Sequence, residues 1–321
     1  MKTVIVTGAS GQDGSYLCEF LDEKGYQVVK FRGDITNYHE IYETIKQCNP
    51  DEIYNLAAKI HYDSPIKTFH VNTMGIINII EAVKSFGTQS KCKIFQASSS
   101  EIFANTKSTW STPQTIHTMR GPRGIYGISK ESADSLVRHY RETEGIFVCS
   151  GILYNHESPR RPVTYVTQKI IRGLQSGKCF QIGNLESRRD WGHAKDYVEM
   201  QWKILQQNKP DDFIIATGKT YSVKEFISEA CKQIGFKIKW QGKGLNEKAI
   251  LINNKKKEIL IKVDKRYFRP NEVHYLKGKN FKAVRKLKFK PKYSFKTLIK
   301  DMLQSDLKLA KSEMILKNND K

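Results

Sequence analysis

Four polar residues in the first half of the chain have types and a spacing that suit proton transfer. Tyr126 and Lys130 stand four residues apart in "YGISK", so on a helix both side chains would lie on one face. Ser99 and Glu101 stand in "QASSSEIF", directly after the strand-like run "KIF". A neighbouring ammonium stabilises a phenolate, so Tyr126 is a credible base for a substrate alcohol. Glu101 is either a second proton carrier or an exposed acid at a strand end.

A glycine-rich segment near the N-terminus, "TGASGQDG", follows a strand-like run and opens a helical pattern. Its glycines permit a tight turn and the close approach of a pyrophosphate to backbone N–H groups. This context favours a dinucleotide site over a structural turn. Lys130 could then also hold the ribose of a nicotinamide. The expected contacts in this segment are Gly8, Ser10, Gly11, Gln12, Asp13 and Gly14.

The end of the second strand-like run should carry the residue that separates NAD from NADP. Here "VVKFRGDITN" leads almost at once to Asp34. Arg32 is the candidate contact for a 2′-phosphate, with Lys30 as a weaker second, and a solvent-exposed basic loop explains both equally well. We expect NADP and leave NAD open, because the loop after the second strand is short.

Alternating elements must position these residues. Strand-like runs such as "TVIVTG" and "IFVCSGILY" alternate with helical patterns such as "GIINIIEAVKSFG", which is typical of βαβ units. The sequence therefore predicts an α/β fold, a Rossmann-type doubly wound parallel sheet with a smaller α/β substrate-binding domain. We expect the dinucleotide-binding domain over residues 1–157 plus about 194–217, and the substrate-binding domain over 158–193 and 218–321.

Composition and charge argue against several classes of protein. No apolar run approaches the roughly 18 residues that span a bilayer, and the N-terminus lacks a signal-peptide pattern. The six cysteines are scattered without metal-ligand spacing, which indicates reduced thiols in a cytoplasmic protein and no metal site. The net charge of +21 comes mostly from Lys and is densest after Phe236. Since no nucleic-acid-binding motif accompanies it, we favour a solvated surface, whose field would also attract an anionic nucleotide.

Longer blocks of sequence point to a family. The glycine loop, the serine cluster and "YGISK" together resemble the extended short-chain dehydrogenase/reductase superfamily. The blocks "NHESPRR", "VTQKI", "RDWGHAKDYVE" and "YFRPNEV" narrow the resemblance to the GDP-mannose 4,6-dehydratase family, over almost the whole chain. The resemblance implies an NADP-dependent enzyme that converts GDP-mannose to GDP-4-keto-6-deoxy-mannose. Glu101 fits this family, because dehydratases carry an acid two residues after the Ser/Thr position.

The resemblance also implies a role for each matching residue. Ser99, Glu101, Tyr126 and Lys130 would be catalytic, with Glu101 removing the C5 proton while the C6 hydroxyl leaves. Beyond the glycine loop, the implied cofactor contacts are Arg32, Asp34, Leu56, Ala57, Tyr126, Lys130, His156 and Arg161. The implied contacts with the GDP-sugar are Ser99, Asn155, Lys169, Arg189, Arg269 and Glu272.

The chain departs from the family pattern at several places. Ser99 replaces the usual Thr, "PRGIYG" replaces "PRSPYG", and the loop before it is longer. At "KFRGDIT" the chain lacks a long, Arg-rich segment that in the family reads the 2′-phosphate and reaches a neighbouring subunit. We therefore expect a homodimer rather than a tetramer. Three alternatives stay open: dehydration of another GDP-hexose or GDP-heptose, a GDP-4-keto-6-deoxy-sugar reductase, and a catalytically idle protein that binds nucleotide sugars or nucleic acid.

Overall fold

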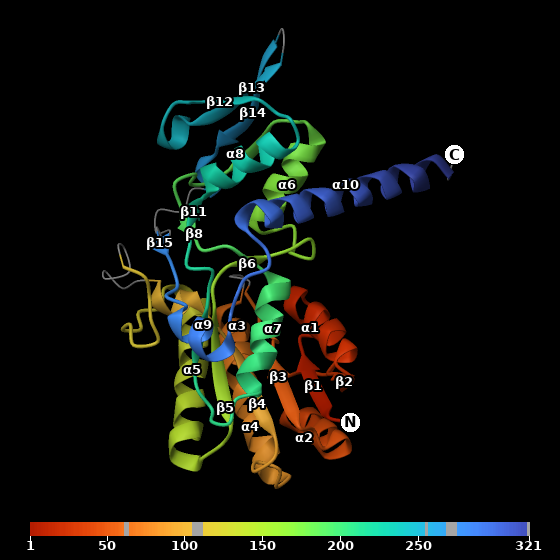
Figure 1. The fold of residues 1–321 in the computed structure, drawn as a ribbon, viewed down its shortest axis with the longest axis vertical. Helices are drawn as coiled ribbons and strands as arrows, with labels where there is room; N and C mark the ends of the chain where they lie inside the picture. The colour runs from red at the N-terminus through yellow and green to blue at the C-terminus, as the bar shows by residue number, and fades with distance from the viewer. Residues whose placement is uncertain (61–63, 105–111, 254–255, 268–274, 320–321) are drawn as a thin grey trace.

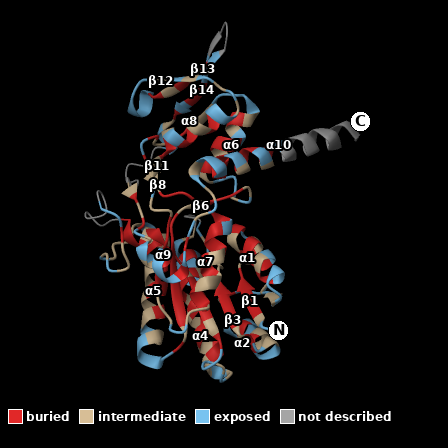
Figure 2. Cartoon of the chain, viewed as in Figure 1, coloured by how far each residue is buried: buried red, intermediate tan, exposed pale blue. Residues whose placement is uncertain are grey.

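The computed structural model describes residues 1–60, 64–104, 112–253, 256–267 and 275–319. The chain forms a lower lobe around a six-stranded sheet and an upper lobe around a four-stranded sheet (Figure 1). Most strands of the lower lobe are largely buried, whereas the edge strand near the N-terminal half, residues 27–30, is partly exposed (Figure 2). Within the described ranges, no helix is both long and apolar enough to cross a membrane.

The six-stranded sheet is parallel throughout. Its strands, in spatial order, are β2 (Gln27–Lys30), β1 (Thr3–Thr7), β3 (Glu52–Asn55), β4 (Lys93–Ser99), β5 (Val148–Leu153) and β10 (Phe213–Ile215). The predicted doubly wound parallel sheet is thereby confirmed.

Alternate residues of β1 serve two separate cores, as the period of a β-strand requires. On β1, Val4 and Val6 pack into the core on one face and Ile5 packs into the core on the other. The first face is covered by α1 (Gln12–Glu23), α7 (Ala194–Leu205) and α9 (Phe281–Leu287). The second face is covered by α2 (Tyr38–Cys48), α4 (Gly75–Ser85) and α5 (Gly124–Glu144).

The strand order fixes where a ligand can bind. From β1 the chain first builds outward to β2 and then returns to place β3 on the other side of β1. In such sheets the crevice beyond the carboxyl ends of the strands, at this reversal, binds ligands. The glycine loop follows β1 and Leu56–Ala57 follow β3, so both segments border that crevice.

The upper lobe has its own apolar core. Three helices, α6 (Val166–Ser176), α8 (Val223–Gln233) and α10 (Phe295–Asn319), pack there. The sheet runs in the order β12 (Ile238–Gln241), β13 (Lys248–Asn253), β14 (Lys256–Val263) and β7 (Phe180–Ile182). The predicted domain boundaries stay a prediction. Helix α9 falls within the predicted substrate-binding domain, but its residues Ala283 and Leu287 pack into a core of the lower sheet.

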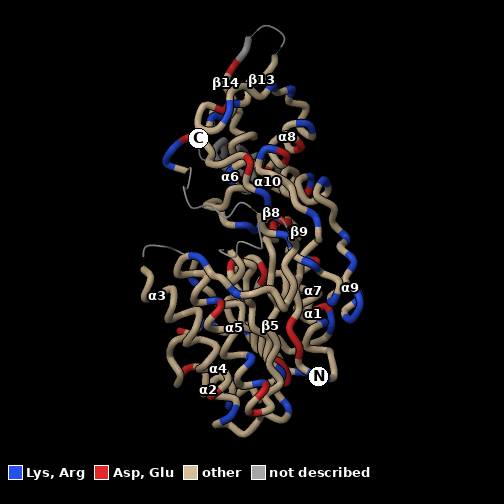
Figure 3. Tube along the Cα trace, turned by 90° about the vertical axis from the view of Figure 1, so that its left-hand side faces the viewer, with Lys and Arg blue, Asp and Glu red and all other residues tan. Residues whose placement is uncertain are grey.

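Short strands connect the two lobes. β6 (His156–Glu157) pairs with β9 (Gly192–His193), and β8 (Arg188–Arg189) lies between β11 (Tyr221–Ser222) and β15 (Tyr275–Leu276). Lys and Arg recur over both lobes and alternate with uncharged residues in the view of Figure 3.

Candidate active site

The glycine loop makes a tight turn that only residues without side chains allow. Gly8 adopts φ +64°, and a Cβ there would stand 2.8 Å from the backbone N of Ala57 and from the carbonyl O of Leu56. A Cβ on Gly14 would stand 2.2 Å from the carbonyl O of Gly8. Gly11 caps α1, and Gly11 and Ser10 face solvent. The loop therefore leaves backbone N–H groups accessible to a pyrophosphate.

Side chains join three neighbouring strands, at the carboxyl ends of β1 and β3 and at the middle of β4. Thr7 Oγ1 accepts hydrogen bonds from the backbone N–H groups of Leu56 (3.2 Å) and Ala57 (3.1 Å). The same hydroxyl donates to Asn55 Oδ1 at 2.7 Å, and Asn55 Nδ2 donates to Gln96 Oε1 at 2.6 Å. This amide ladder, Thr7–Asn55–Gln96, fixes β1, β3 and β4 relative to one another beside the crevice.

The side chains of Gln12 and Asp13 turn toward the protein interior. The two carboxylate oxygens of Asp13 lie 2.9 Å from His156 Nε2, and Gln201 Nε2 donates to Asp13 Oδ2 at 2.9 Å. Gln12 Nε2 donates to the carbonyl O of His156 at 3.1 Å, and Ser158 Oγ donates to Gln12 Oε1 at 2.8 Å. The turn after β5 is thereby bound to the start of α1.

Charge decides the protonation of this pair. Burial lowers the pKa of His156, but the Asp13 carboxylate outweighs it and leaves the pKa above its ordinary value. Burial raises the pKa of Asp13, but His156 outweighs it and leaves that pKa below its ordinary value. Arg161 lies close by, with Nε 3.1 Å from Glu157 Oε2 and its guanidinium 3.7 Å from the ring centroid of Tyr165.

Tyr126 and Lys130 occupy consecutive turns at the start of α5. Lys130 is 2% exposed, and its Nζ donates to the carbonyl O of Ala97 at 2.8 Å and lies 5.9 Å from the ring centroid of Tyr126. Burial lowers the pKa of Lys130 to about 8. Burial raises the pKa of Tyr126, and a hydrogen bond with Ser99 acts in the opposite direction.

Ser99 and Glu101 meet this pair from the end of β4. Ser99 Oγ accepts a hydrogen bond of 3.2 Å from the backbone N–H of Glu101 and thereby caps the 3-10 turn Ser100–Phe103. The charge of Glu101 raises the pKa of Tyr126, so the two side chains are electrostatic neighbours. The structure thus brings together the four residues that the sequence singled out for proton transfer.

Asn72 is a site residue that sequence reasoning missed. It lies in a π-helical turn, His70–Met74, and its Nδ2 donates to Ser129 Oγ (2.9 Å) and to the carbonyl O of Lys59 (3.0 Å). Ser129 Oγ in turn donates to the carbonyl O of Tyr126 at 2.8 Å. Asn72 therefore holds the first turn of α5 in place. The signal available was a polar residue within a helical pattern, and π-turns often mark functional sites.

The predicted cofactor-specificity residues lie on an open edge. Arg32 and Asp34 are exposed in the connection between β2 and α2. Asp34 Oδ1 accepts hydrogen bonds from the N–H and hydroxyl of Thr36, which lower the pKa of Asp34. The predicted contact between Arg32 and a 2′-phosphate stays a prediction, and the residue lies directly after the second strand.

The predicted substrate residues come from several segments. Asn155 follows β5, and its carbonyl O accepts a hydrogen bond from Gly192 N. Lys169 on α6 places Nζ 3.3 Å from the ring centroid of Tyr267, and Arg189 lies on β8. The other two predicted residues, Arg269 and Glu272, lie outside the described residues.

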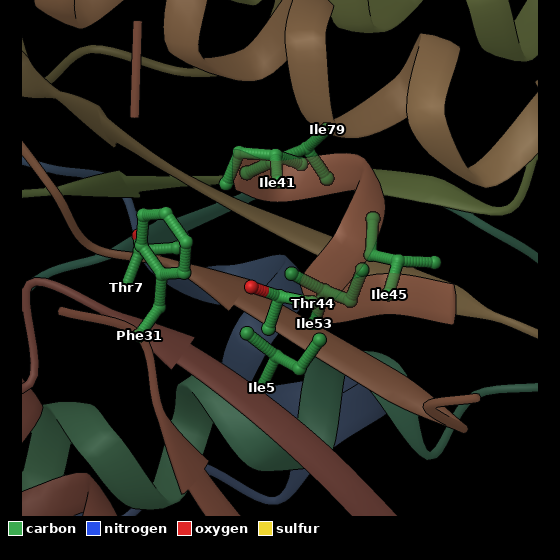
Figure 4. A pocket seen from close by; sticks show the side chains of 8 residues that line it. All are labelled: Ile5, Thr7, Phe31, Ile41, Thr44, Ile45, Ile53 and Ile79. Atoms are coloured by element: carbon green, nitrogen blue, oxygen red, sulfur yellow. The ribbon is translucent and has the colours of Figure 1, made fainter. Parts of the chain in front are cut away.

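A small hollow between β1, β3 and α2 is separate from this site (Figure 4). Its lining is almost wholly apolar: Ile5, Thr7, Phe31, Ile41, Thr44, Ile45, Ile53 and Ile79. None of the four proton-transfer candidates lines it. Among the described residues, no group of three or more His, Cys, Asp or Glu side chains could hold a metal ion.

Comparisons with known proteins agree with this geometry. The sequence profile of a family described as GDP-mannose 4,6 dehydratase matches residues 30–302. A GDP-mannose 4,6-dehydratase from Yersinia enterocolitica is 40% identical, over 99% of this chain and 97% of that protein. Their alignment spans 365 positions, more than the 321 residues of this chain, so the chain lacks segments that the relative has.

Solved structures at 18% identity share the fold. RMD from Pseudomonas aeruginosa, complexed with NADPH, has a TM-score of 0.77 over 95% of this chain and 99% of its own. A dTDP-glucose 4,6-dehydratase from Bacillus anthracis, in complex with NAD, has a TM-score of 0.80 over 96% of this chain and 97% of its own. These likenesses confirm the predicted Rossmann-type architecture.

Proposed function

Because the chain belongs to the GDP-mannose 4,6-dehydratase family, as its sequence predicts, we propose that it converts GDP-mannose to GDP-4-keto-6-deoxy-mannose with NADP as a bound cofactor. The observation that carries the proposal is the meeting of Ser99, Glu101, Tyr126 and Lys130 at the sheet edge that the glycine loop also borders. The reaction oxidises C4, eliminates water across C5 and C6, and returns the hydride to C6.

Tyr126 accepts the proton of the 4-hydroxyl group, and Ser99 orients that hydroxyl by a hydrogen bond. When bound, the cofactor accepts a hydride from C4 and returns it to C6, so no cofactor is consumed. The positive charge of Lys130 favours the phenolate of Tyr126, which burial alone disfavours. Lys130 is held for this purpose by the carbonyl O of Ala97.

Glu101 acts on the neighbouring carbon. Once C4 is a ketone the C5 proton is acidified, and a carboxylate beside it can remove that proton and pass it to the C6 hydroxyl, which leaves as water. The proton that Tyr126 took from the 4-hydroxyl group balances the one that C5 regains when the hydride returns to C6. The role of Glu101 separates a dehydratase from a 4-keto-sugar reductase, because reduction at C4 needs no base at C5.

NADP is the cofactor we favour over NAD. The glycine loop suits a pyrophosphate, since Gly8 and Gly14 allow a tight turn at the start of α1 in which a Cβ would collide with neighbouring backbone. Arg32 carries the charge that suits a 2′-phosphate, and it is exposed directly after β2. The other cofactor contacts we propose are Asp34, Leu56, Ala57, His156 and Arg161, with Ser10 and Gly11 at the loop.

For the GDP-sugar we propose contacts from Asn155, Lys169 and Arg189, together with Arg269 and Glu272. Guanidinium groups bind phosphate through two parallel hydrogen bonds, which suits the diphosphate of the substrate. We further propose that the protein is a cytoplasmic homodimer. Its mass in solution tests this, since a stable tetramer would contradict it.

One incubation tests the proposed activity. Purified protein with bound NADP should convert GDP-mannose to a product lighter by one water, identified by mass and sugar NMR, without net cofactor use. Net oxidation of NADPH on a 4-keto-sugar would point to the reductase, and turnover of another GDP-sugar alone would revise the substrate. Glu101→Gln should lose the product and keep NADP binding, whereas unchanged turnover would remove Glu101 from the mechanism.

A further inference from the structure

Three residues from distant parts of the chain anchor the glycine loop. Asp13 opens α1, His156 begins β6 and Gln201 lies on α7, separated from Asp13 by 143 and 188 residues. We name these residues the anchor triad. The side chains of Asp13 and His156 are only 15% and 13% exposed, and Gln201 is fully buried. The sequence assigns Asp13 and His156 to cofactor contact and gives no role to Gln201.

The hydrogen-bonding geometry favours a protonated imidazole. His156 Nδ1 lies 2.7 Å from the carbonyl O of Tyr154, and Nε2 lies 2.9 Å from both carboxylate oxygens of Asp13. Both partners are acceptors, so each ring nitrogen satisfies its partner only by carrying a proton. The ring also stacks on Tyr197, at 4.7 Å between centroids. Both ring nitrogens are thus already engaged within the protein.

A positive His156 is useful at this position. A pyrophosphate at the start of α1 is attracted by free N–H groups and by the helix dipole, but the Asp13 carboxylate repels it from the first turn. An imidazolium at hydrogen-bond distance cancels that charge. The same contact ties α1 to β6, and the hydrogen bond from Gln201 ties α1 to α7.

Other groups face His156 from every packed element. Asp13 comes from α1, Arg161 from the segment after β6, His193 from β9, and the phenol of Tyr197 from α7. Burial and Arg161 lower the pKa of His156, but Asp13 leaves it raised. The charge cancellation is therefore present below the raised pKa of His156 and is lost as pH rises through it.

We propose that the anchor triad positions the glycine loop for dinucleotide binding and neutralises the one carboxylate at the start of α1. Its members act through the loop and touch no reacting atom. The inference rests on the proposed function only for its ligand, NADP⁺.

Binding, rather than turnover, tests the proposal. Kd for NADP⁺ is measured by calorimetry from pH 6.5 to 9.5 for wild type, Asp13→Asn, His156→Asn and the double variant. Asp301→Asn is the matched control, because it removes the carboxylate partner of a different histidine, His193, at 3.0 Å. Thermal unfolding of each nucleotide-free variant reports its stability separately.

We expect His156→Asn to raise Kd about tenfold at pH 6.5, the scale of a lost hydrogen bond to a charged group. The ratio of the Kd of His156→Asn to the Kd of wild type should fall toward one at alkaline pH, because wild type also loses the imidazolium there. Lys130 has a pKa of about 8 and also titrates in this range, but it does so in both proteins. The ratio of their two Kd values at each pH therefore removes its contribution. The Kd of the double variant for NADP⁺ should be no higher than the higher Kd of the two single variants. The Kd of the control, Asp301→Asn, should equal that of wild type at each pH.

A constant penalty across the pH range would overturn the proposal, as would an unchanged Kd for His156→Asn with lowered stability alone. Wild type could bind NADP⁺ with the expected pH dependence but leave GDP-mannose unchanged. This result would refute the proposed activity and would leave the proposal about the anchor triad intact. Wild type that fails to bind NADP⁺ would overturn both.

Discussion

Replacing Lys130 with Met should make the protein more stable while it removes activity. A pKa of about 8 instead of 10.5 means that the charged form is disfavoured in the native state by about 3 kcal/mol at neutral pH, since one pKa unit corresponds to about 1.4 kcal/mol. Lys130 is 2% exposed, so solvent screens little of this cost. Met matches the length of the buried stem and carries no charge.

The substitution also has a cost. Ala97 O loses its 2.8 Å hydrogen bond from Lys130 but keeps a 3.2 Å hydrogen bond from Gln96 Nε2, so the loss is about 1 kcal/mol. We therefore expect Lys130→Met, free of nucleotide, to gain about 1–2 kcal/mol in the free energy of unfolding at pH 7. Activity should fall at least about 100-fold, because the phenolate of Tyr126 loses its cation.

The pH dependence gives a second readout. Between the native pKa of about 8 and the unfolded value near 10.5, the unfolded chain binds more protons at Lys130. The stability of wild type therefore rises with pH across this window, and Lys130→Met should lack that rise. Urea denaturation from pH 7 to 10 measures both. A variant less stable than wild type at pH 7, with the same slope, would refute the reasoning.

Lys93 provides a matched control at the opposite end of β4. Its Nζ donates to the carbonyl O of Leu205 (2.8 Å) and of Gln207 (3.1 Å), and burial lowers its pKa. Lys93→Met should leave catalysis intact, because this end of the strand is remote from the glycine loop.

Three further substitutions test other parts of the site. Asn72→Ala should lower stability by about 2–4 kcal/mol and reduce kcat, since the partly buried backbone of Lys59 and the buried hydroxyl of Ser129 lose their hydrogen bonds; urea denaturation and steady-state rates check this. Gly14→Ala should abolish NADP⁺ binding by calorimetry, because its Cβ would collide with the carbonyl O of Gly8, and unchanged affinity would contradict the tight turn of the glycine loop. Arg32→Ser should raise Kd for NADP⁺ about tenfold and leave Kd for NAD⁺ unchanged, while equal effects on both would remove Arg32 from 2′-phosphate recognition.

The parts of the fold that sequence predicts are those that local pattern determines. The apolar run of β1 and the periodicity of α4 are visible in a few residues, and a βαβ alternation then implies the parallel sheet. Family membership was equally predictable, because long blocks such as "RDWGHAKDYVE" carry it.

The parts that sequence could not predict depend on distant contacts. Asn72 reaches Ser129 across 57 positions, and Gln201 reaches Asp13 across 188. Neither partner is marked by a local pattern. The direction of the Asp13 side chain was equally hidden, because the glycine motif constrains the backbone of this loop and leaves its side chains undetermined. The proposed contacts at Arg269 and Glu272 stay predictions.

The amide ladder holds the strands in place without help from the surface connections between them. Thr7 donates to Asn55 and Asn55 donates to Gln96, so the direction of each hydrogen bond permits one alignment of the strand ends. Gln96 then shares the carbonyl of Ala97 with Lys130. Hydrogen bonds inside the sheet thus fix the position of the glycine loop relative to α5, the helix that carries Tyr126 and Lys130. A change in the length of a surface connection therefore need not move one half of the proposed active site against the other.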